Sequence, residues 1–360
     1  MDARAQNRAL LARQLLLERS RLSVPEVVEA LVGLQSQAPQ AHYAGLWSRI
    51  EGFDPAVASQ LLESRALVRI ALMRGTIHLV TAEDARFLRP LVQPVLERAL
   101  RGGQGPGADV DLVELAAQAR ALVEEAPRTF AEIGAALAAR WPGEDPERLS
   151  RAARCGLALA QVPPRGLWGR SGPARHTTVE KWLGAPLDPR PSSDRLVLRY
   201  LAAFGPATVA DAQAWSGLTR LREVFDRLGP ALVRLPADDG RTLWDLPDAP
   251  RPDAEVEAPV RLLADFDNLL LSHVERTHVV DESHRRAIFT VNGIIPRTVL
   301  VDGRVAGTWT SEVAGARCSV RVASFARLSP GVRDDVEREA HAFAAMAAPG
   351  ADVHVQHAVR

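Results

Sequence analysis

The chain has 360 residues, which is room for roughly two to four structural units of ordinary size. Its 44 basic and 44 acidic residues balance, so the overall charge gives no support to a strongly basic nucleic-acid-binding protein, and its two cysteines, Cys155 and Cys318, are too few for a disulfide scaffold or a zinc site. The N-terminus lacks an apolar signal core and no segment reaches the ~20 apolar residues of a membrane span, so we expect a cytoplasmic protein without membrane contact.

The first hundred residues read as helices followed by a hairpin. Ser23 and Glu26 have the spacing of a capping box, and Pro25 lies in the first turn of the helix they begin. These elements fit a long copy of a winged helix-turn-helix unit over residues 1–105. Helices are predicted over 6–19, 23–35, 39–50 and 54–64, a hairpin over 67–72 and 76–80, and a further helix over 81–100.

A polar motif, Gln35-Ser36-Gln37, interrupts this pattern where the apolar stripe of the second predicted helix ends. Pro39 disfavours helical geometry just before it, so we expect both glutamines in the last helical turn or just beyond it, at the corner between the second and third helices. From the residues alone, the amides either cap the helix end or form a polar site.

Two further copies of the unit follow, at residues 106–190 and 191–257. In the first of them, Thr129 and Glu132 have capping-box spacing. In the second, Asp238-Asp239-Gly240 is a turn between two predicted strands. The predicted helices are 112–123, 129–140 and 146–159, then 194–204, 208–215 and 220–228, and the predicted strands lie in 162–169, 232–235 and 242–246.

A basic segment over residues 161–179 contains Arg165, Arg170, Arg175 and His176 and no acidic residue. Such a loop suits a phosphate backbone, because phosphate contacts dominate nucleic-acid affinity. A merely solvated loop would have the same composition. The sequence leaves both interpretations open.

Beyond residue 258 the pattern becomes strand-rich. Asn292-Gly293 and Asp302-Gly303 are turns of the hairpin type, and a final amphipathic helix begins at Pro330. We therefore expect a mainly α protein with β structure (α+β): three tandem winged helix-turn-helix domains and a small β-barrel-like region, residues 258–360, closed by a helix. Its strands are predicted over 260–263, 287–292, 298–301, 304–310 and 319–325.

Three histidines, His273, His278 and His284, invite a metal site, which we reject because no cysteine or matched carboxylate set accompanies them. Asp265 and Asp267 could form a carboxylate pair, but their spacing before Asn268 is more typical of a turn. We expect neither a metal nor a cofactor.

Four stretches of the chain resemble the AlkZ and YcaQ type of DNA glycosylase, in which winged-helix domains precede a C-terminal β-barrel-like region. The first stretch is similar to the Gln-x-Gln signature of the AlkZ branch, with Ser36 at a middle position that is usually apolar in the family. The stretches are residues 33–38, 72–80, 265–273 and 301–309.

The resemblance implies hydrolysis of the N-glycosidic bond of alkylated purines. Alkylation at N7 makes the base cationic, so the base leaves as a neutral group and needs no general acid. The enzyme must then stabilise an oxocarbenium-like sugar and place a water beside it. We expect Gln37 to position this water and Gln35 to support it or contact the lesion.

A second constellation is Arg74-Gly75-Thr76-Ile77-His78, in which strand alternation places Thr76 and His78 on one side. His78 either lines the cleft beside the glutamines or is a structural histidine. The predicted catalytic residues are Gln35 and Gln37, and the predicted DNA- or lesion-binding residues are Ser36, Gln40, His42, Arg74, Thr76, His78, Arg165, Arg170 and Arg175.

The sequence thus predicts a monomeric glycosylase that acts on double-stranded DNA carrying N7-alkylpurines, including bulky adducts and interstrand crosslinks. It would serve DNA repair or self-resistance to a DNA-alkylating natural product. The rival hypothesis is a non-catalytic winged-helix regulator or drug-sequestering protein, with recognition helices at 146–159 and 220–228.

Overall fold

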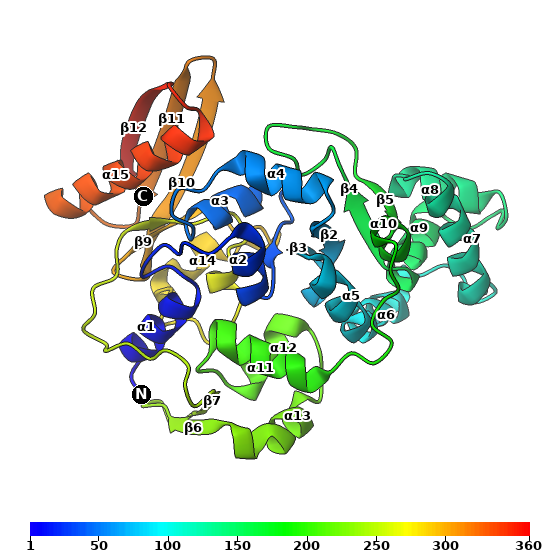
Figure 1. Ribbon diagram of the computed structural model, residues 1–360, viewed down its shortest axis with the longest axis horizontal. Helices are drawn as coiled ribbons and strands as arrows, with labels where there is room; N and C mark the ends of the chain where they lie inside the picture. The colour runs from blue at the N-terminus through cyan, green and yellow to red at the C-terminus, as the bar shows by residue number, and fades with distance from the viewer.

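The computed structural model describes the backbone of residues 1–360 and the side chains of all of them except Arg101 and Gln104. Its mixed α and β architecture agrees with the predicted class (Figure 1). The first part contains α1 (Ala3–Arg13), α2 (Val24–Ala30), β1 (Leu34–Gln35), α3 (Ala41–Trp47), α4 (Pro55–Glu63), β2 (Leu67–Ala71) and β3 (Ile77–Thr81).

The long helix predicted over residues 81–100 is two helices, α5 (Ala82–Leu91) and α6 (Gln93–Ala99). Pro94 has no N–H and its ring crowds the carbonyl one turn earlier, which favours a break in the helix just before it, and Val92 there has a non-helical ψ of 2°.

The next two parts each contain three helices followed by a hairpin, in the predicted order, but most of the segment 162–169, predicted to contain a strand, is loop, because the strands lie at Leu159–Val162 and Arg175–Thr178. Capping boxes begin α8 at Thr129 and α12 at Thr208. The elements are α7 (Leu112–Glu125), α8 (Phe130–Ala138), α9 (Pro146–Gly156), β4 (Leu159–Val162), β5 (Arg175–Thr178) and α10 (Val179–Leu183), then α11 (Ser193–Phe204), α12 (Val209–Ser216), α13 (Leu221–Leu228), β6 (Val233–Pro236) and β7 (Thr242–Asp245).

One sheet joins strands from the first two predicted domains. Its order is β1-β3-β2-β4-β5, and the junction pairs Arg69 of β2 with Gln161 of β4 and Ile70 with Ala160. The hairpin of the second unit therefore continues the hairpin of the first, whereas α7, α8 and α9 extend away from this sheet (Figure 1). The predicted domain boundaries remain predictions, and a shared sheet crosses the first of them.

The C-terminal region is an open sheet in the order β12-β11-β10-β9-β8, not a closed barrel. The predicted strand at 287–292 is wrong: it is α14 (Arg285–Ile288) and a turn, in which Ile288 is buried and Val291 is fully exposed. The sheet consists of β8 (Arg261–Leu262), β9 (Thr298–Val301), β10 (Arg304–Ala314), β11 (Arg317–Ser324) and β12 (Asp352–Val359).

The helix α15 (Pro330–Ala347) carries the chain from β11 to β12, which pair in parallel. Phe343 of α15 packs edge-on against both Trp309 of β10 and Trp47 of α3, with ring centroids 4.7 and 5.3 Å apart. These contacts attach the C-terminal sheet to the first part of the chain.

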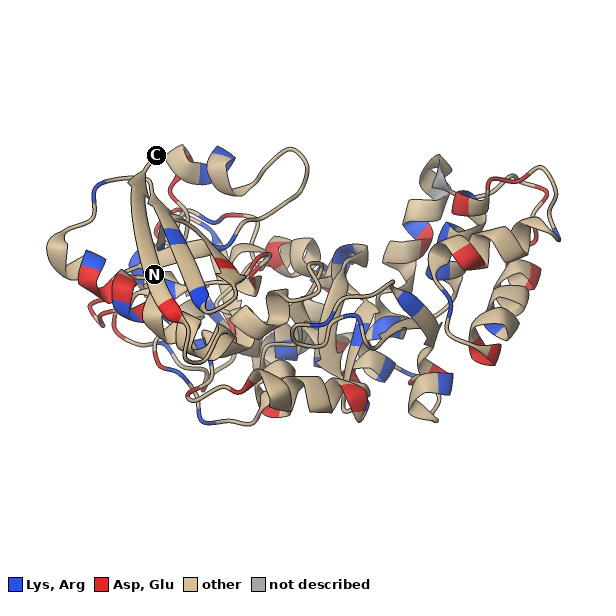
Figure 2. Cartoon of the chain, turned by 90° about the horizontal axis from the view of Figure 1, so that it is seen from above, with Lys and Arg blue, Asp and Glu red and all other residues tan. Residues whose placement is uncertain are grey.

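Charges are distributed evenly over this fold. Figure 2 shows acidic and basic residues interspersed on the helices at both ends of the molecule. Within the described residues, no helix is long and apolar enough to cross a lipid bilayer.

Candidate active site

The helix before the Gln-Ser-Gln motif ends earlier than predicted. The amide of Gly33 donates to the carbonyl of Val28 at 2.8 Å and that of Val32 to Glu29 at 3.0 Å, which is the hydrogen-bond pattern of a Schellman motif. Val32 and Gly33 have φ of 54° and 87°. These left-handed residues end α2 at Ala30 and turn the chain into a strand.

The motif therefore begins on a strand, with Gln35 as the last residue of β1 and Ser36 and Gln37 just beyond it, and it does not lie at a helix end. β1 pairs with β3 in antiparallel register, with Gln35 opposite His78. A Cβ at Gly33 would lie 2.6 Å from Val80 Cγ1 and 3.0 Å from the Leu79 carbonyl oxygen, so only glycine permits this approach.

The side chain of Gln35 is buried and held by a cation. Its Oε1 accepts a hydrogen bond from Arg74 Nη2 at 2.6 Å. The other terminal nitrogen of Arg74 donates to the carbonyl of Trp215, at the end of α12. Burial, and then the charge of Arg276, lowers the pKa of Arg74 to about 10, so the guanidinium stays charged at neutral pH.

Gln37, in contrast, is exposed. Its Oε1 accepts a hydrogen bond from the backbone amide of Ile77 at 3.0 Å, while the amide of Ser36 donates to the Ile77 carbonyl at 2.8 Å. The side chain of Gln37 thus continues the pairing of β1 with β3 beyond the end of the strand.

Both glutamine amides have their orientation fixed by partners that can only donate, a guanidinium for Gln35 and a backbone N–H for Gln37. Each carbonyl oxygen has two lone pairs, and each of these bonds uses one. Among the described residues, neither amide nitrogen has a recorded hydrogen-bond partner. The pair can therefore offer both a donor and an acceptor to a bound molecule.

Ser36, the middle residue of the motif, and His42 are both fully buried. Ser36 Oγ and His42 Nδ1 are 2.8 Å apart. Burial, and then the charge of Arg69, lowers the pKa of His42 well below its usual value, so its ring is neutral at neutral pH. The structure places these two predicted DNA-binding residues away from the surface.

Arg69 holds the backbone of the motif by hydrogen bonds, a contact that the sequence did not predict. Its Nη2 donates to the carbonyl of Ser36 at 2.9 Å and its Nη1 to that of Pro39 at 3.3 Å. Burial, and then the charge of Arg165, lowers its pKa to about 10. An arginine inside the apolar strand Leu67–Ala71 was the signal for a buried cation with a specific task.

His78 is buried opposite Gln35, 2 % exposed. Its Nδ1–H donates to the carbonyl of Thr76 at 2.9 Å. Burial, and then the charge of Arg74, lowers the pKa of His78 to about 3. The hydroxyl of Thr76 donates to the Met73 carbonyl, so both side chains brace the turn that carries Arg74.

The basic loop between β4 and β5 packs against residues that follow the motif in the chain. Gln40 donates through Nε2 to the carbonyl of Leu167 at 2.8 Å, and the hydroxyl of Tyr43 donates to that of Gly166 at 3.0 Å. Arg170 is exposed on this loop. Arg165 bonds the carbonyl of Gly172, and Arg175 forms a bidentate ion pair with Glu132.

A second missed residue, Asn268, lies on the other edge of β1. Its Nδ2 donates to the carbonyl of Gly33 at 2.6 Å, and its Oδ1 accepts from the amide of Gln35 at 3.2 Å. Asp267 and Arg49 form a bidentate ion pair, with both side chains fully buried. The sequence interpretation of a turn was right for Asp267, which caps a short 3₁₀ helix, Asn268–Leu270, but it overlooked the contact with the motif.

Comparison with known proteins decides the family. A family model described as DNA glycosylase AlkZ-like matches residues 28–346. The chain belongs to this family. A Streptomyces sahachiroi protein named interstrand DNA cross-link repair glycosylase is 27% identical over 321 residues, 82% of this chain and 84% of that protein. The solved structure of the S. sahachiroi DNA glycosylase AlkZ has the same fold, with a TM-score of 0.80, 24% identity and 99% of each chain covered.

In this AlkZ-like glycosylase, His273, His278 and His284 are not arranged as ligands of one metal ion. The rings of His273 and His278 meet edge-on with centroids 5.0 Å apart, and His284 stacks on Phe325 at 4.2 Å. Among the described side chains, no group of three or more histidine, cysteine, aspartate or glutamate residues could hold a metal ion.

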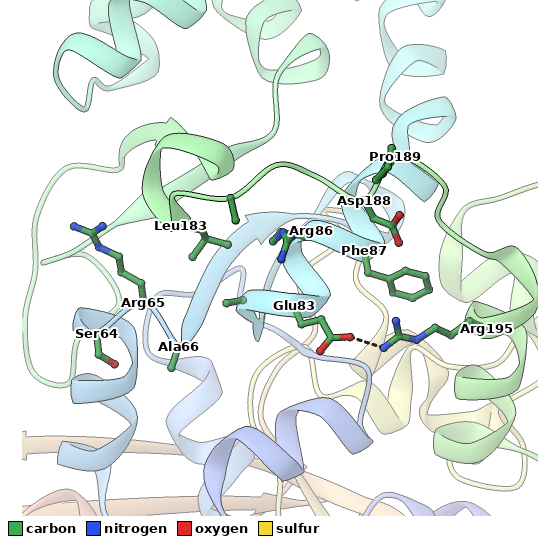
Figure 3. Close-up of a pocket in the computed structure, with 12 residues that line it drawn as sticks. Ser64, Arg65, Ala66, Glu83, Arg86, Phe87, Leu183, Asp188, Pro189 and Arg195 are labelled. Carbon is green, nitrogen blue, oxygen red and sulfur yellow. Dashed lines mark hydrogen bonds and ion pairs between the residues drawn. The ribbon is translucent and has the colours of Figure 1, made fainter.

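The AlkZ-like chain also has a cavity of about 670 Å³ at the end of β3 opposite the motif (Figure 3). Glu83, in the first turn of α5, and Arg195 of α11 point toward one another there and form an ion pair at 2.8 Å. Gln35 and Gln37 are not among the residues lining it. The polar site at the motif is therefore distinct from this cavity.

Proposed function

We propose that this DNA glycosylase hydrolyses the N-glycosidic bond of N7-alkylated purines in double-stranded DNA, including bulky adducts and interstrand crosslinks, and leaves an abasic site. The relative from S. sahachiroi, named a cross-link repair glycosylase, supports the substrate class. The observation that carries the proposal is the exposed amide of Gln37, fixed by Ile77 with one lone pair of its carbonyl unused.

The chemistry of the motif fits a base that is already cationic. Among the described residues, the motif forms hydrogen bonds with amides, arginines and a histidine, and its own serine hydroxyl takes part in one of them. No carboxylate bonds to the motif there. An N7-alkylpurine leaves without protonation, so a site without an acid suffices. The Gln37 carbonyl would accept a hydrogen bond from the attacking water and offer partial negative charge to the developing sugar cation.

The place of the positive charge supports the same substrate. Arg74 lies behind Gln35 and is directed at its carbonyl, and Arg170 is exposed on the basic loop. An exposed cation such as Arg170 suits the phosphates that flank a lesion, whereas both terminal nitrogens of Arg74 donate to carbonyls of the protein itself. We further propose that three winged-helix units hold the duplex around the motif and that the protein acts as a monomer, in DNA repair or self-resistance to an alkylating natural product.

The first prediction concerns Gln37. Gln37→Ala should lower the single-turnover rate of 7-methylguanine release by about 10²-fold, because one preorganised polar contact to the transition state is lost. Free base and alkali-labile abasic sites are measured with a duplex that contains one lesion. Gln118→Ala, on the exposed surface of α7, is the matched glutamine control and should retain the full rate.

The same assay separates the proposal from the rival function. A duplex with an N7-linked interstrand crosslink, resolved on a denaturing gel, tests whether crosslinks are unhooked. Tight binding of wild-type protein without any release of base would identify a DNA-binding regulator and overturn the proposal. Full activity of Gln37→Ala would overturn the role of the residue but leave the glycosylase in place.

A further inference from the structure

The strand β1, which contains Gln35, is unusually short and follows a strained backbone residue. β1 has two residues, and β3 pairs with only one of its edges. Val32 just before it has a left-handed conformation that β-branched residues rarely adopt. A strand this short has few contacts of its own to hold its register.

The side chain of Asn268 takes the place of a strand on the other edge. The backbone groups of residues 33 and 35 point to one edge of β1, and those of 34 and 36 point to the opposite edge, where Ser36 bonds Ile77. One amide satisfies both groups on the open edge, because it donates to Gly33 and accepts from Gln35. A carboxylate or an alkyl group of the same shape cannot do both.

The residue before Asn268 is held by a buried ion pair. Asp267, the preceding residue, accepts two hydrogen bonds from Arg49 at 2.7 and 2.9 Å, and both side chains are inaccessible to solvent. Asp267 also accepts from the amide of Leu269. Asn268 itself is buried, and both polar atoms of its side-chain amide bond the backbone at Gly33 and Gln35, which leaves the amide directed at the strand and away from a bound duplex.

We propose that Asn268 is a positioning residue for catalysis: by closing the open edge of β1, it sets the backbone register that directs Gln35 and Gln37 toward the substrate. The inference rests on the proposed glycosylase function and assigns it a residue outside the Gln-Ser-Gln motif. Displacement of a catalytic group by about 1 Å can cost 10²-fold in rate, so a modest loss of register is sufficient to reduce catalysis.

The first experiment compares Asn268→Ala with Asn7→Ala. Asn7 is an equally buried asparagine whose amide bonds the carbonyls of His278 and Gly303, far along the chain from the motif. Asn268→Ala should accelerate hydrogen–deuterium exchange in peptides covering residues 33–37, and Asn7→Ala should leave those peptides unchanged. Equal exchange in Asn268→Ala and wild type would overturn the proposal.

The second experiment measures 7-methylguanine release at saturating enzyme. Asn268→Ala should slow the single-turnover rate about 10²-fold while the dissociation constant for lesion DNA stays within about twofold, since the residue does not contact DNA. An unchanged rate, or an equal loss in Asn7→Ala, contradicts the positioning role. If the wild type releases no base, the proposed function fails, and the exchange experiment still decides the role of Asn268.

Asn268→Asp provides a variant of the same shape if Asn268→Ala does not fold. Its ionised carboxylate can accept from Gln35 but faces the Gly33 carbonyl with like polarity, whereas the protonated acid regains a donor for that carbonyl. The ratio of the variant's enzymatic rate to that of wild type at the same pH should therefore rise as the pH is lowered. A ratio that does not change with pH would contradict the requirement for a donor at this position.

Discussion

At the scale of single residues, the middle position of the motif is a matter of packing. Ser36 is fully buried and its hydroxyl is paired with His42, so a side chain at this position meets the interior and not the substrate. Members of the family usually have an apolar residue here. The serine is accommodated because His42 supplies a polar partner, and the two side chains form one unit.

Removal of the Ser36 hydroxyl should lower the free energy of unfolding most when His42 is still present. Ser36→Ala leaves His42 Nδ1 buried without a partner and should lower the free energy of unfolding by about 1–3 kcal/mol. In the double variant Ser36→Ala, His42→Phe, we expect the loss to be smaller than the sum of the single losses by about 1 kcal/mol. Urea denaturation of the four proteins measures this coupling, and strictly additive losses would show that the pair is not a unit.

At the scale of elements, Gly33, just before β1, leaves no room for a side chain against β3. Gly33→Ala should destabilise the protein by about 1–3 kcal/mol and slow base release, because its Cβ meets Val80 and the Leu79 carbonyl and moves the motif. Gly52→Ala is the matched control: φ is also positive, 63°, but nothing lies within 4 Å of the added carbon. Equal stability and activity of the two variants would mean that the contact with β3 tolerates displacement.

Features set by neighbouring residues were predicted correctly from the sequence, and features set by contacts between distant residues were not. Capping boxes at Ser23, Thr129 and Thr208 are local signals, and the helices they predict begin where expected. The strand character of Gln35 was not predictable from its neighbours, because it results from pairing with residues more than forty positions along the chain. The end of α2 was not predicted because Val32 ends the helix in a left-handed conformation, which is usually adopted by glycine or asparagine.

The candidate site was predictable only in part for the same reason. Gln35, Arg74 and His78 were all named as candidates from the sequence, and the structure places Arg74 and His78 next to Gln35, while their roles stay predictions. Asn268 was assigned to a turn because its contact with the motif spans more than two hundred residues. β12, with alternating half-buried and exposed residues, had a readable strand pattern that the prediction omitted.

At the scale of the whole molecule, burial keeps several histidines neutral. Burial lowers the pKa of His78 to about 3 and that of His176 to about 4, from an unfolded value of 6.5. It lowers the pKa of three more histidines, which are His42, His273 and His278. Below pH 6.5 the unfolded chain therefore binds protons that the folded chain does not, which favours unfolding.

We accordingly predict that the free energy of unfolding is highest above pH 6.5 and falls as the pH is lowered from 6.5 toward about 4. Urea denaturation at pH 7.5, 6.5 and 5.5 measures this dependence. His176→Phe should make it less steep, because the ring of His176 already stacks on Phe130 at 4.2 Å. The exposed His354→Gln should leave it unchanged, and an equally stable wild type at pH 5.5 and 7.5 would contradict the prediction.

The sheet that crosses from the first predicted unit into the second also restricts how such a protein can evolve. Because β2 pairs with β4, the second unit cannot be exchanged by recombination like an independent module. An incoming segment must bring a strand that matches the register at Arg69 and Ile70, and a loop that fits Gln40 and Tyr43. Diversity in the outer helices α7 and α8 is free of this requirement, so variation among related chains should concentrate there and spare the hairpin.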